Sequence, residues 1–136
     1  MNEDEIKDTL SKFKTVAVVG ISPKEHRPSY RVAFYLKSKG FRIIPVRPDG
    51  EEILEEKVYR SLSEIPRETA VDVVDIFRKS EDVPPIVEQA ILRGAKVVWM
   101  QEGIIHTGAA ERAEEAGLRV VMDRCMKKEH QRLINQ

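Results

Sequence analysis

The residues best suited to chemistry gather in one polar segment near the N-terminus: Gly20, Ser22, Lys24 and Arg27. A glycine lets the backbone come close to a ligand, a serine hydroxyl can donate a hydrogen bond, and two cations attract phosphate oxygens. A segment with helical spacing begins near Ser29, and the first amides of a helix lack partners within it. This order predicts a diphosphate-binding loop. The alternative is a tight turn with ordinary solvated charges.

Polar residues also follow the next apolar runs of the chain: Arg47 and Pro48, then Arg78, then Gln101, Glu102 and Gly103. An NAD site normally carries an acid after the second strand for the ribose hydroxyls, whereas this chain has Arg47 there. Only Gly20 of the usual G-x-G-x-x-G fingerprint is present. A cation suits a phosphorylated ribose, which both NADP and coenzyme A possess, so both ligands remain open at this point.

Catalytic and metal-binding patterns are not found in the sequence. The three histidines are far apart and we expect surface positions for them: His26, His106 and His130. No two of them have the i, i+4 spacing of a helical metal pair, so no metal site is predicted. Asp72 and Asp75, three positions apart, fall on opposite faces of a strand. We expect an exposed position for Asp72 and a hydrogen-bonded structural role for Asp75.

Five apolar runs have the length of strands: Val16–Val19, Ile43–Val46, Val71–Phe77, Val97–Met100 and Val120–Met122. Segments with helical spacing, each followed by a glycine suited to a C-cap, separate most of them: Ser29–Lys39, Pro84–Arg93 and Thr107–Ala116. Apolar strands that alternate with helices predict a parallel sheet buried on both faces. We therefore predict a single α/β domain over residues 1–136, with a Rossmann-like, doubly wound, five-stranded parallel sheet and helices on both faces.

Two further segments complete the predicted domain. Ile6–Phe13 is expected to add a helix at the start, and Arg47–Pro66 is expected to be a longer connection with one short helix. Ligands of open parallel sheets bind beyond the carboxyl ends of the strands, which is where the polar segments fall. A larger residue at Gly20, such as valine, is expected to block a ligand there while leaving the fold mostly intact.

The composition narrows the class of protein. In 136 residues, 23 basic side chains balance 23 acidic ones, so no global field attracts nucleic acid or an anionic membrane. The single cysteine, Cys125, excludes an internal disulfide framework. The acidic start, Met1–Glu5, lacks the features of a signal peptide. We expect a cytoplasmic protein whose anion recognition is local.

Several short motifs together resemble those of a known family: Val18–Ser22, Arg27–Tyr30, Ile44–Pro48, Val74–Arg78, Trp99–Gly103 and Val121–Cys125. Over nearly its full length the chain resembles the stand-alone CoA-binding domain family. That family is similar in turn to the N-terminal CoA-binding domain of the succinyl-CoA synthetase α subunit. The resemblance implies that coenzyme A, or an acyl-CoA, binds at the carboxyl edge of the sheet. Ligase activity is not implied, because the phosphorylated histidine of the synthetase lies in a second domain.

The resemblance also implies which residues contact the cofactor. Gly20, Ile21 and Ser22 would carry the phosphates with Lys24 or Arg27 assisting, next to Ser29 and Tyr30 of the following motif. Val46, Arg47 and Pro48 would flank the adenosine. Phe77, Arg78, Gln101, Glu102 and Gly103 would line the pantetheine arm.

Three kinds of function are considered, of which the third is disfavoured because a degenerate pocket would not need these polar residues together at one edge. The first is a non-catalytic module that senses or carries CoA, or serves as a subunit of an enzyme. The alternative is an NADP-dependent or nucleotide-processing enzyme subunit whose catalytic groups come from a partner, and the third is a structural protein with a degenerate pocket. Cys125 follows the last strand among several cations that could lower its thiol pKa, so exchange into a mixed disulfide with CoA is a further hypothesis. A partly buried, unreactive cysteine is the alternative.

Overall fold

The five apolar runs form one parallel sheet at the centre of the protein. The computed structural model describes residues 1–135, and its main strands are β1 (Thr15–Val19), β2 (Arg42–Val46), β5 (Val73–Ile76), β6 (Val97–Met100) and β7 (Arg119–Val121). Their order is β2-β1-β5-β6-β7, and each neighbouring pair is parallel. The strand order reverses between β1 and β5, which is the switch point where such folds bind ligands. The predicted Rossmann-like α/β architecture is confirmed.

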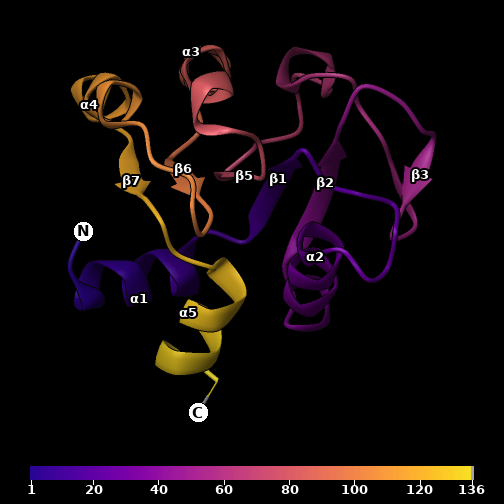
Figure 1. The fold of residues 1–136 in the computed structure, drawn as a ribbon, viewed down its shortest axis with the longest axis horizontal. Coiled ribbons are helices and arrows are strands. Elements are labelled where there is room, and N and C mark those ends of the chain that lie inside the picture. The colour runs from indigo at the N-terminus through magenta and orange to yellow at the C-terminus, as the bar shows by residue number, and fades with distance from the viewer. Residues whose placement is uncertain (136) are drawn as a thin grey trace.

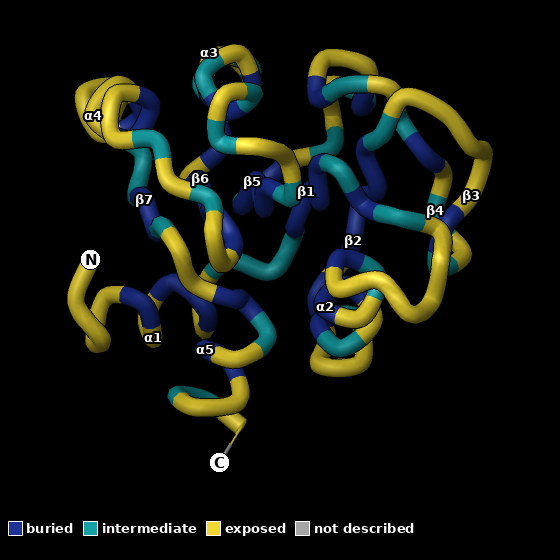
Figure 2. The backbone as a smooth tube through the Cα atoms, in the orientation of Figure 1, coloured by how far each residue is buried: buried dark blue, intermediate teal, exposed yellow. Residues whose placement is uncertain are grey.

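Helices cover both faces of the sheet (Figure 1). One face carries α1 (Glu3–Lys12), α2 (Pro28–Ser38) and α5 (Met126–Leu133), and the other carries α3 (Val83–Leu92) and α4 (Thr107–Glu115). Alternate strand residues enter two separate hydrophobic clusters, one beneath each layer of helices. The strands are therefore buried on both sides, as their dark colour in Figure 2 shows.

The ends of the helices follow local rules. The expected helix at Ile6–Phe13 begins earlier, at Glu3, because the Asn2 side chain accepts a hydrogen bond from the Glu5 amide and caps the first turn. Pro84 and Pro85 lie in the first turn of α3, as their missing amide hydrogens require. The glycines predicted to end α2, α3 and α4 follow these helices with positive φ. Within residues 1–135, no helix has the length and apolar character needed to cross a bilayer.

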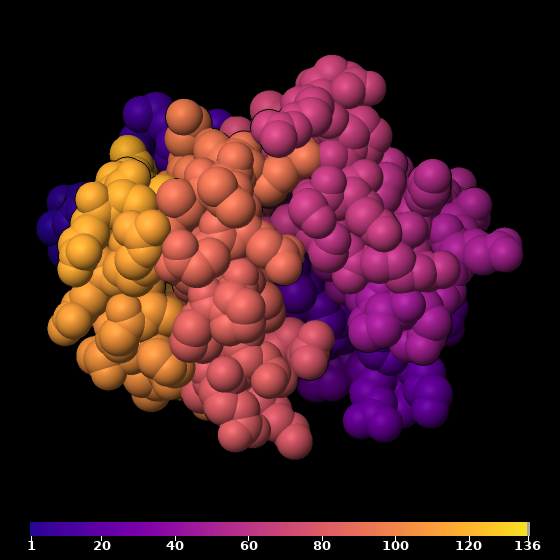
Figure 3. Space-filling model, turned by 90° about the horizontal axis from the view of Figure 1, so that it is seen from above, coloured from indigo at the N-terminus to yellow at the C-terminus, as the bar shows by residue number. Residues whose placement is uncertain are grey.

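The connection after β2 contains more structure than the sequence suggested. It includes the expected short helical turn, η1 (Leu62–Glu64), but also an antiparallel hairpin of β3 (Glu52–Ile53) and β4 (Glu56–Lys57). Leu54 and Glu55 form the hairpin turn with positive φ, a conformation that usually requires asparagine or glycine. Seen from above, the segments of α4, α3 and this connection lie side by side across one face (Figure 3).

Helix α5 was not predicted, because few of its residues are apolar. His130 on this helix is 2% exposed, so the surface position expected for it was wrong. Its Nδ1 lies 2.8 Å from the Tyr35 hydroxyl, and the ring also packs edge-on against Phe41. The His106 side chain likewise has a structural role, because it accepts a hydrogen bond from the Ala109 amide and caps α4.

Asp75 is an acid in the middle of the sheet. It is 0% exposed on β5, in register with Val18 on β1 and Trp99 on β6. Neither carboxyl oxygen has a hydrogen-bond partner among the described residues, so the predicted hydrogen-bonded role was wrong. Burial raises the pKa of this carboxyl well above its usual range, because the ionised form loses its hydration. Asp72 is partly exposed rather than exposed, and it accepts a hydrogen bond from the Thr15 amide.

The protonation of Asp75 couples stability to pH. The folded state holds the proton more tightly than the unfolded state, in which the carboxyl titrates near its ordinary pKa of 3.8. The contribution of Asp75 to stability is therefore greatest below that pH and falls as the pH rises toward the folded pKa, by at most about 1.4 kcal/mol per pH unit. We expect Asp75→Asn to remove this slope, measured by urea unfolding between about pH 5 and pH 8. Asp72→Asn is the control and should keep the slope of the wild type. If the free energies of unfolding of wild type and Asp75→Asn change with pH in parallel, the assignment to Asp75 is contradicted.

Candidate functional site

A cavity of about 350 Å³ opens at the carboxyl edge of the sheet, beside the switch point. Its lining comes from the turns after β1, β2 and β5: Gly20, Ile21, Ser22, Pro23, Lys24, Arg27, Arg47, Pro48 and Arg78. We call this cavity the cationic cradle, because four of these residues are cations and none is an acid. The sequence predicted all of them except Pro23.

Two serines fix the shape of the loop after β1. The Ser29 hydroxyl accepts a hydrogen bond from the Ser22 amide at 2.9 Å, and the Ser22 hydroxyl accepts one from the Lys24 amide at 3.1 Å. Ser29 is buried in the first turn of α2, so this bond joins the loop to the helix. The amides of Ser29 and Tyr30 precede the first intrahelical bond and are available to an anion.

The four cations of the cradle differ in their partners. Arg47 pairs with Asp49 at 2.9 Å and Arg78 with Asp82 at 3.2 Å, both at the surface. The Nε of Arg47 is buried and has no hydrogen-bond partner among the described residues. Lys24 and Arg27 form none of the ion pairs found in residues 1–135. A buried donor left unpaired is costly, so the cradle fits an anionic ligand.

Gly20 lies where the chain leaves β1, with φ of +90°. A Cβ built on it would lie 2.6 Å from the carbonyl oxygen of Phe77 and 2.9 Å from Cδ of Arg78. Both contacts are too short, and the nearer one is to the backbone of the residue that directly follows β5. The expectation that valine here would spare the fold is therefore wrong, because its side chain would press against the sheet edge rather than only into the ligand space.

Several predicted site residues lie outside the cradle. Val46 is buried in the core cluster beneath α3 and α4, and Phe77 packs partly buried against the opposite cluster. Gln101 is also buried, where its side-chain oxygen accepts a hydrogen bond from the Met126 amide at the start of α5. Tyr30 lines a different hollow, on the outer side of α2.

The remaining predicted residues belong to the edge beyond β6. Glu102 is exposed and forms an ion pair with Lys128. The exposed Gly103 donates its amide hydrogen to the Asp123 carboxylate at 2.7 Å. This part of the edge therefore meets α5 and the turn after β7, which the sequence did not show to be neighbours.

Cys125 lies just before α5 and is 7% exposed, inside the cluster formed with α1 and α2. Its thiol is not part of the cradle lining. Exchange with a CoA disulfide stays a prediction, and burial of Cys125 limits the access of a disulfide to its sulfur. Among the residues that the structure describes, no group of three or more His, Cys, Asp or Glu is placed to hold a metal ion.

The segments that form the cradle all lie within the match to one known domain family. A family described as a CoA binding domain matches residues 14–131, a span that includes every residue of the cradle. The chain belongs to this CoA-binding domain family. The resemblance inferred from the sequence motifs is thereby confirmed.

Similar proteins include both stand-alone chains and large enzymes. The uncharacterized protein YneT of Bacillus subtilis (strain 168) is 38% identical over 126 residues, which is 93% of this chain and 92% of that protein. A solved structure of a hypothetical protein from Pyrococcus horikoshii OT3 matches with a TM-score of 0.94 and 42% identity, covering 98% of this chain and 93% of that one. The ADP-forming acetate–CoA ligase II of Archaeoglobus fulgidus is 34% identical over 104 residues, but these cover 75% of this chain and only 15% of the ligase.

The close approach of Gly20 to β5 predicts a specific loss of stability. We expect Gly20→Ala to be less stable than Gly50→Ala, because both glycines have positive φ but only Gly20 has atoms within 4 Å of the added Cβ. Strain from positive φ costs both variants about 1 to 2 kcal/mol, and the clash should cost Gly20→Ala about 1 to 3 kcal/mol more. Urea unfolding measures the difference. Equal losses of stability in the two variants would contradict the prediction, because they would mean that the backbone near Phe77 moves aside at no cost.

Proposed function

We propose that this protein binds coenzyme A or an acyl-CoA in the cationic cradle, as a non-catalytic sensor, carrier or subunit module of the cytoplasm. The observation that carries the proposal is a cavity at the switch point that is lined by four cations and no acid. Membership of the CoA-binding domain family supports the choice of ligand. In this family context, the cradle is the part of the fold whose charge best matches a phosphorylated nucleotide.

Each charged group of the ligand has a counterpart in the cradle. The diphosphate would lie over Gly20 and Ser22, facing the free amides of Ser29 and Tyr30 at the positive end of α2. Lys24 and Arg27 extend from the same loop and would neutralise its oxygens. Because none of the groups named here has to break an ion pair first, binding costs little reorganisation.

Arg47 is the counterpart for the phosphate on the ribose. It follows β2 and lines the cradle, so a 3′-phosphate bound there would meet its guanidinium in place of the exposed Asp49 carboxylate. The pantetheine arm would then leave the cradle past Arg78 and follow the edge of β5 and β6, where Phe77, Glu102 and Gly103 lie. Gln101 would support this edge from below through its bond to α5.

The chemistry of the lining favours binding over catalysis. The cradle contains no His, Asp, Glu or Cys, so its one hydroxyl, that of Ser22, has no carboxylate or imidazole in the lining to activate it for attack on a thioester. The ADP-forming acetate–CoA ligases similar to this chain are several times longer, as the coverage of 15% and 18% indicates. We infer that this protein corresponds to the part that holds CoA, and that any reaction of the bound thioester would need a partner.

Ligand selectivity tests the proposal directly. By titration calorimetry we expect saturable binding of CoA, with NADP and NAD weaker by about tenfold or more. NAD is disfavoured because Arg47, rather than the acid that holds a free ribose diol, directly follows β2. NADP is disfavoured because the chain belongs to a CoA-binding family, whose ligand carries a 3′-phosphate in place of the 2′-phosphate of NADP. Equal or tighter binding of NADP would overturn the CoA assignment and favour the alternative of an NADP-dependent enzyme subunit.

The role of the loop after β1 in phosphate binding can be tested by comparing two arginine variants. Arg27→Ala should weaken CoA binding by about 1 to 3 kcal/mol if its guanidinium meets a phosphate oxygen. Arg31→Ala is the matched control, because Arg31 is an exposed arginine one turn further along α2 and outside the cradle. Similar CoA affinities for both variants and the wild type would place the phosphates elsewhere.

A further inference from the structure

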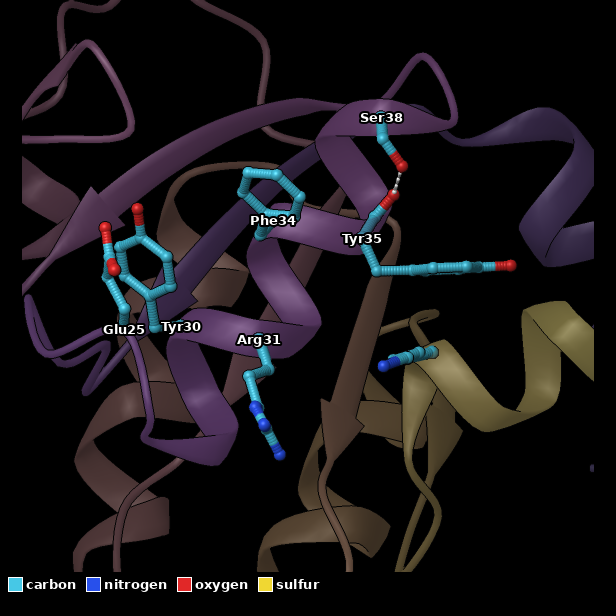
Figure 4. A pocket seen from close by; sticks show the side chains of 7 residues that line it. Glu25, Tyr30, Arg31, Phe34, Tyr35 and Ser38 are labelled. Atoms are coloured by element: carbon cyan, nitrogen blue, oxygen red, sulfur yellow. Dashed lines mark hydrogen bonds between the residues drawn. The ribbon is translucent and has the colours of Figure 1, made fainter.

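A second hollow, of about 410 Å³, lies over the outer face of α2 and extends to the start of α5 (Figure 4). Three aromatic residues and two cations dominate its lining: Tyr30, Phe34, Tyr35, Arg31 and Lys127. We call this hollow the aromatic groove. It shares no lining residue with the cationic cradle, although both begin in the loop that joins β1 to α2.

The aromatic groove exposes apolar surface that the fold does not need. Phe34 is 59% exposed, while the buried side of α2 is formed by Val32, Ala33 and Leu36. The rings of Tyr30 and Phe34 stack with centroids 6.5 Å apart and planes inclined by 18°. Adjoining exposed aromatic rings are typical of the anchor positions of protein interfaces.

The floor of the groove is held rigid from below. The Tyr35 hydroxyl lies 2.8 Å from Nδ1 of the buried His130. Burial, with the nearby ammonium groups of Lys14 and Lys39, lowers the pKa of His130, so the ring stays neutral and can hydrogen bond with the tyrosine at physiological pH. A fixed aromatic surface loses little conformational entropy when a partner binds.

Three cations around the groove have no ion-pair partner among the described residues. Arg31, Lys39 and Lys127 form none of the ion pairs found in residues 1–135. By contrast, Lys37 on α2 pairs with Glu55, and Lys128 on α5 pairs with Glu102. In a chain of zero net charge, the groove is therefore a local positive surface.

The ammonium groups of Lys39 and Lys127 lie 5.6 and 5.7 Å from the centre of the Tyr35 ring. These contacts hold two charges at the margin of the apolar floor. Glu25 is the one acid among the lining residues, and it lies beside Tyr30 (Figure 4).

We propose that the aromatic groove docks an acidic segment of a partner protein. A large apolar side chain of the segment packs against Tyr30 and Phe34, and neighbouring carboxylates meet Arg31 and Lys127. The apolar anchor supplies affinity and the charges select acidic partners over basic ones. This goes beyond the binding of CoA, because it assigns a separate surface for the partner beside the cofactor.

The test uses a fluorescein-labelled amphipathic peptide with Trp and Leu on one face and Glu on the other, compared with the same peptide carrying Lys in place of Glu. By fluorescence anisotropy we expect the acidic peptide to bind about tenfold or more tightly than the basic one, and to do so equally in excess CoA. Phe34→Ala should lower the affinity for the acidic peptide about tenfold. Arg31→Glu should reverse the preference between the two peptides.

Leu92→Ala is the matched control, because Leu92 is an exposed apolar residue on α3, 81% exposed and outside the groove. It should leave peptide binding unchanged. Equal affinity for the two peptides, or an affinity that Phe34→Ala does not alter, would overturn the proposal. Displacement of the peptide by CoA would place it in the cradle instead. A dimer in sedimentation experiments that Phe34→Ala abolishes would assign the groove to a second copy of this chain.

Discussion

The structure of the carboxyl edge of the sheet, where the cradle lies, depends on how closely the chain passes the end of β5 as it leaves β1. Gly20 donates its amide hydrogen to the Val46 carbonyl at 2.9 Å, while Phe77 donates to the Val19 carbonyl at 2.8 Å. The end of β1 is thus bonded on both sides, and Gly20 has no room for a side chain beside Phe77. The next residue, Ile21, turns into the core and is 1% exposed. Only then does the loop rise over the edge, which leaves the space that forms the cradle.

The same loop separates two surfaces of different chemistry. Lys24 and Arg27 line the cradle, whereas Tyr30 and Arg31 line the aromatic groove. The bond between the Ser22 amide and the buried Ser29 hydroxyl fixes the boundary between them. A protein with balanced total charge can therefore present unpaired cations to a phosphate on one side and to a partner on the other, since local arrangement rather than net charge sets the field at short range.

Much of the fold could be predicted because its determinants are local and repetitive. Five apolar runs, glycines after helices and prolines at a helix start gave the correct sheet and four of the helices. Helix α5 was missed because it is mostly polar and is held by tertiary contacts, such as that of His130 with Tyr35. The hairpin was missed because Leu54 and Glu55 adopt positive φ without the usual turn residues.

The candidate site was predictable in part for a related reason. Residues that directly follow the central strands must meet at one edge, so Arg47 and Arg78 could be placed beside the loop after β1. The Gln101 side chain is directed toward the start of α5, where it accepts a hydrogen bond from the Met126 amide, and the sequence did not show that α5 packs there. Asp75 was misjudged because the spacing of a residue gives its face on a strand but not its hydrogen-bond partners. Phe34 is an exposed aromatic residue on a helix, for which no sequence pattern distinguishes an interface from solvent.

The central claim is that the phosphates of CoA bind in the cradle. A nitrogen-15 NMR titration with CoA tests it at the backbone amides that line or face this cavity. We expect the largest chemical-shift changes at the amides of Gly20, Ser22, Ser29 and Tyr30, with little change in the hairpin around Leu54. Saturable changes confined to residues away from the loop between β1 and α2 would contradict it.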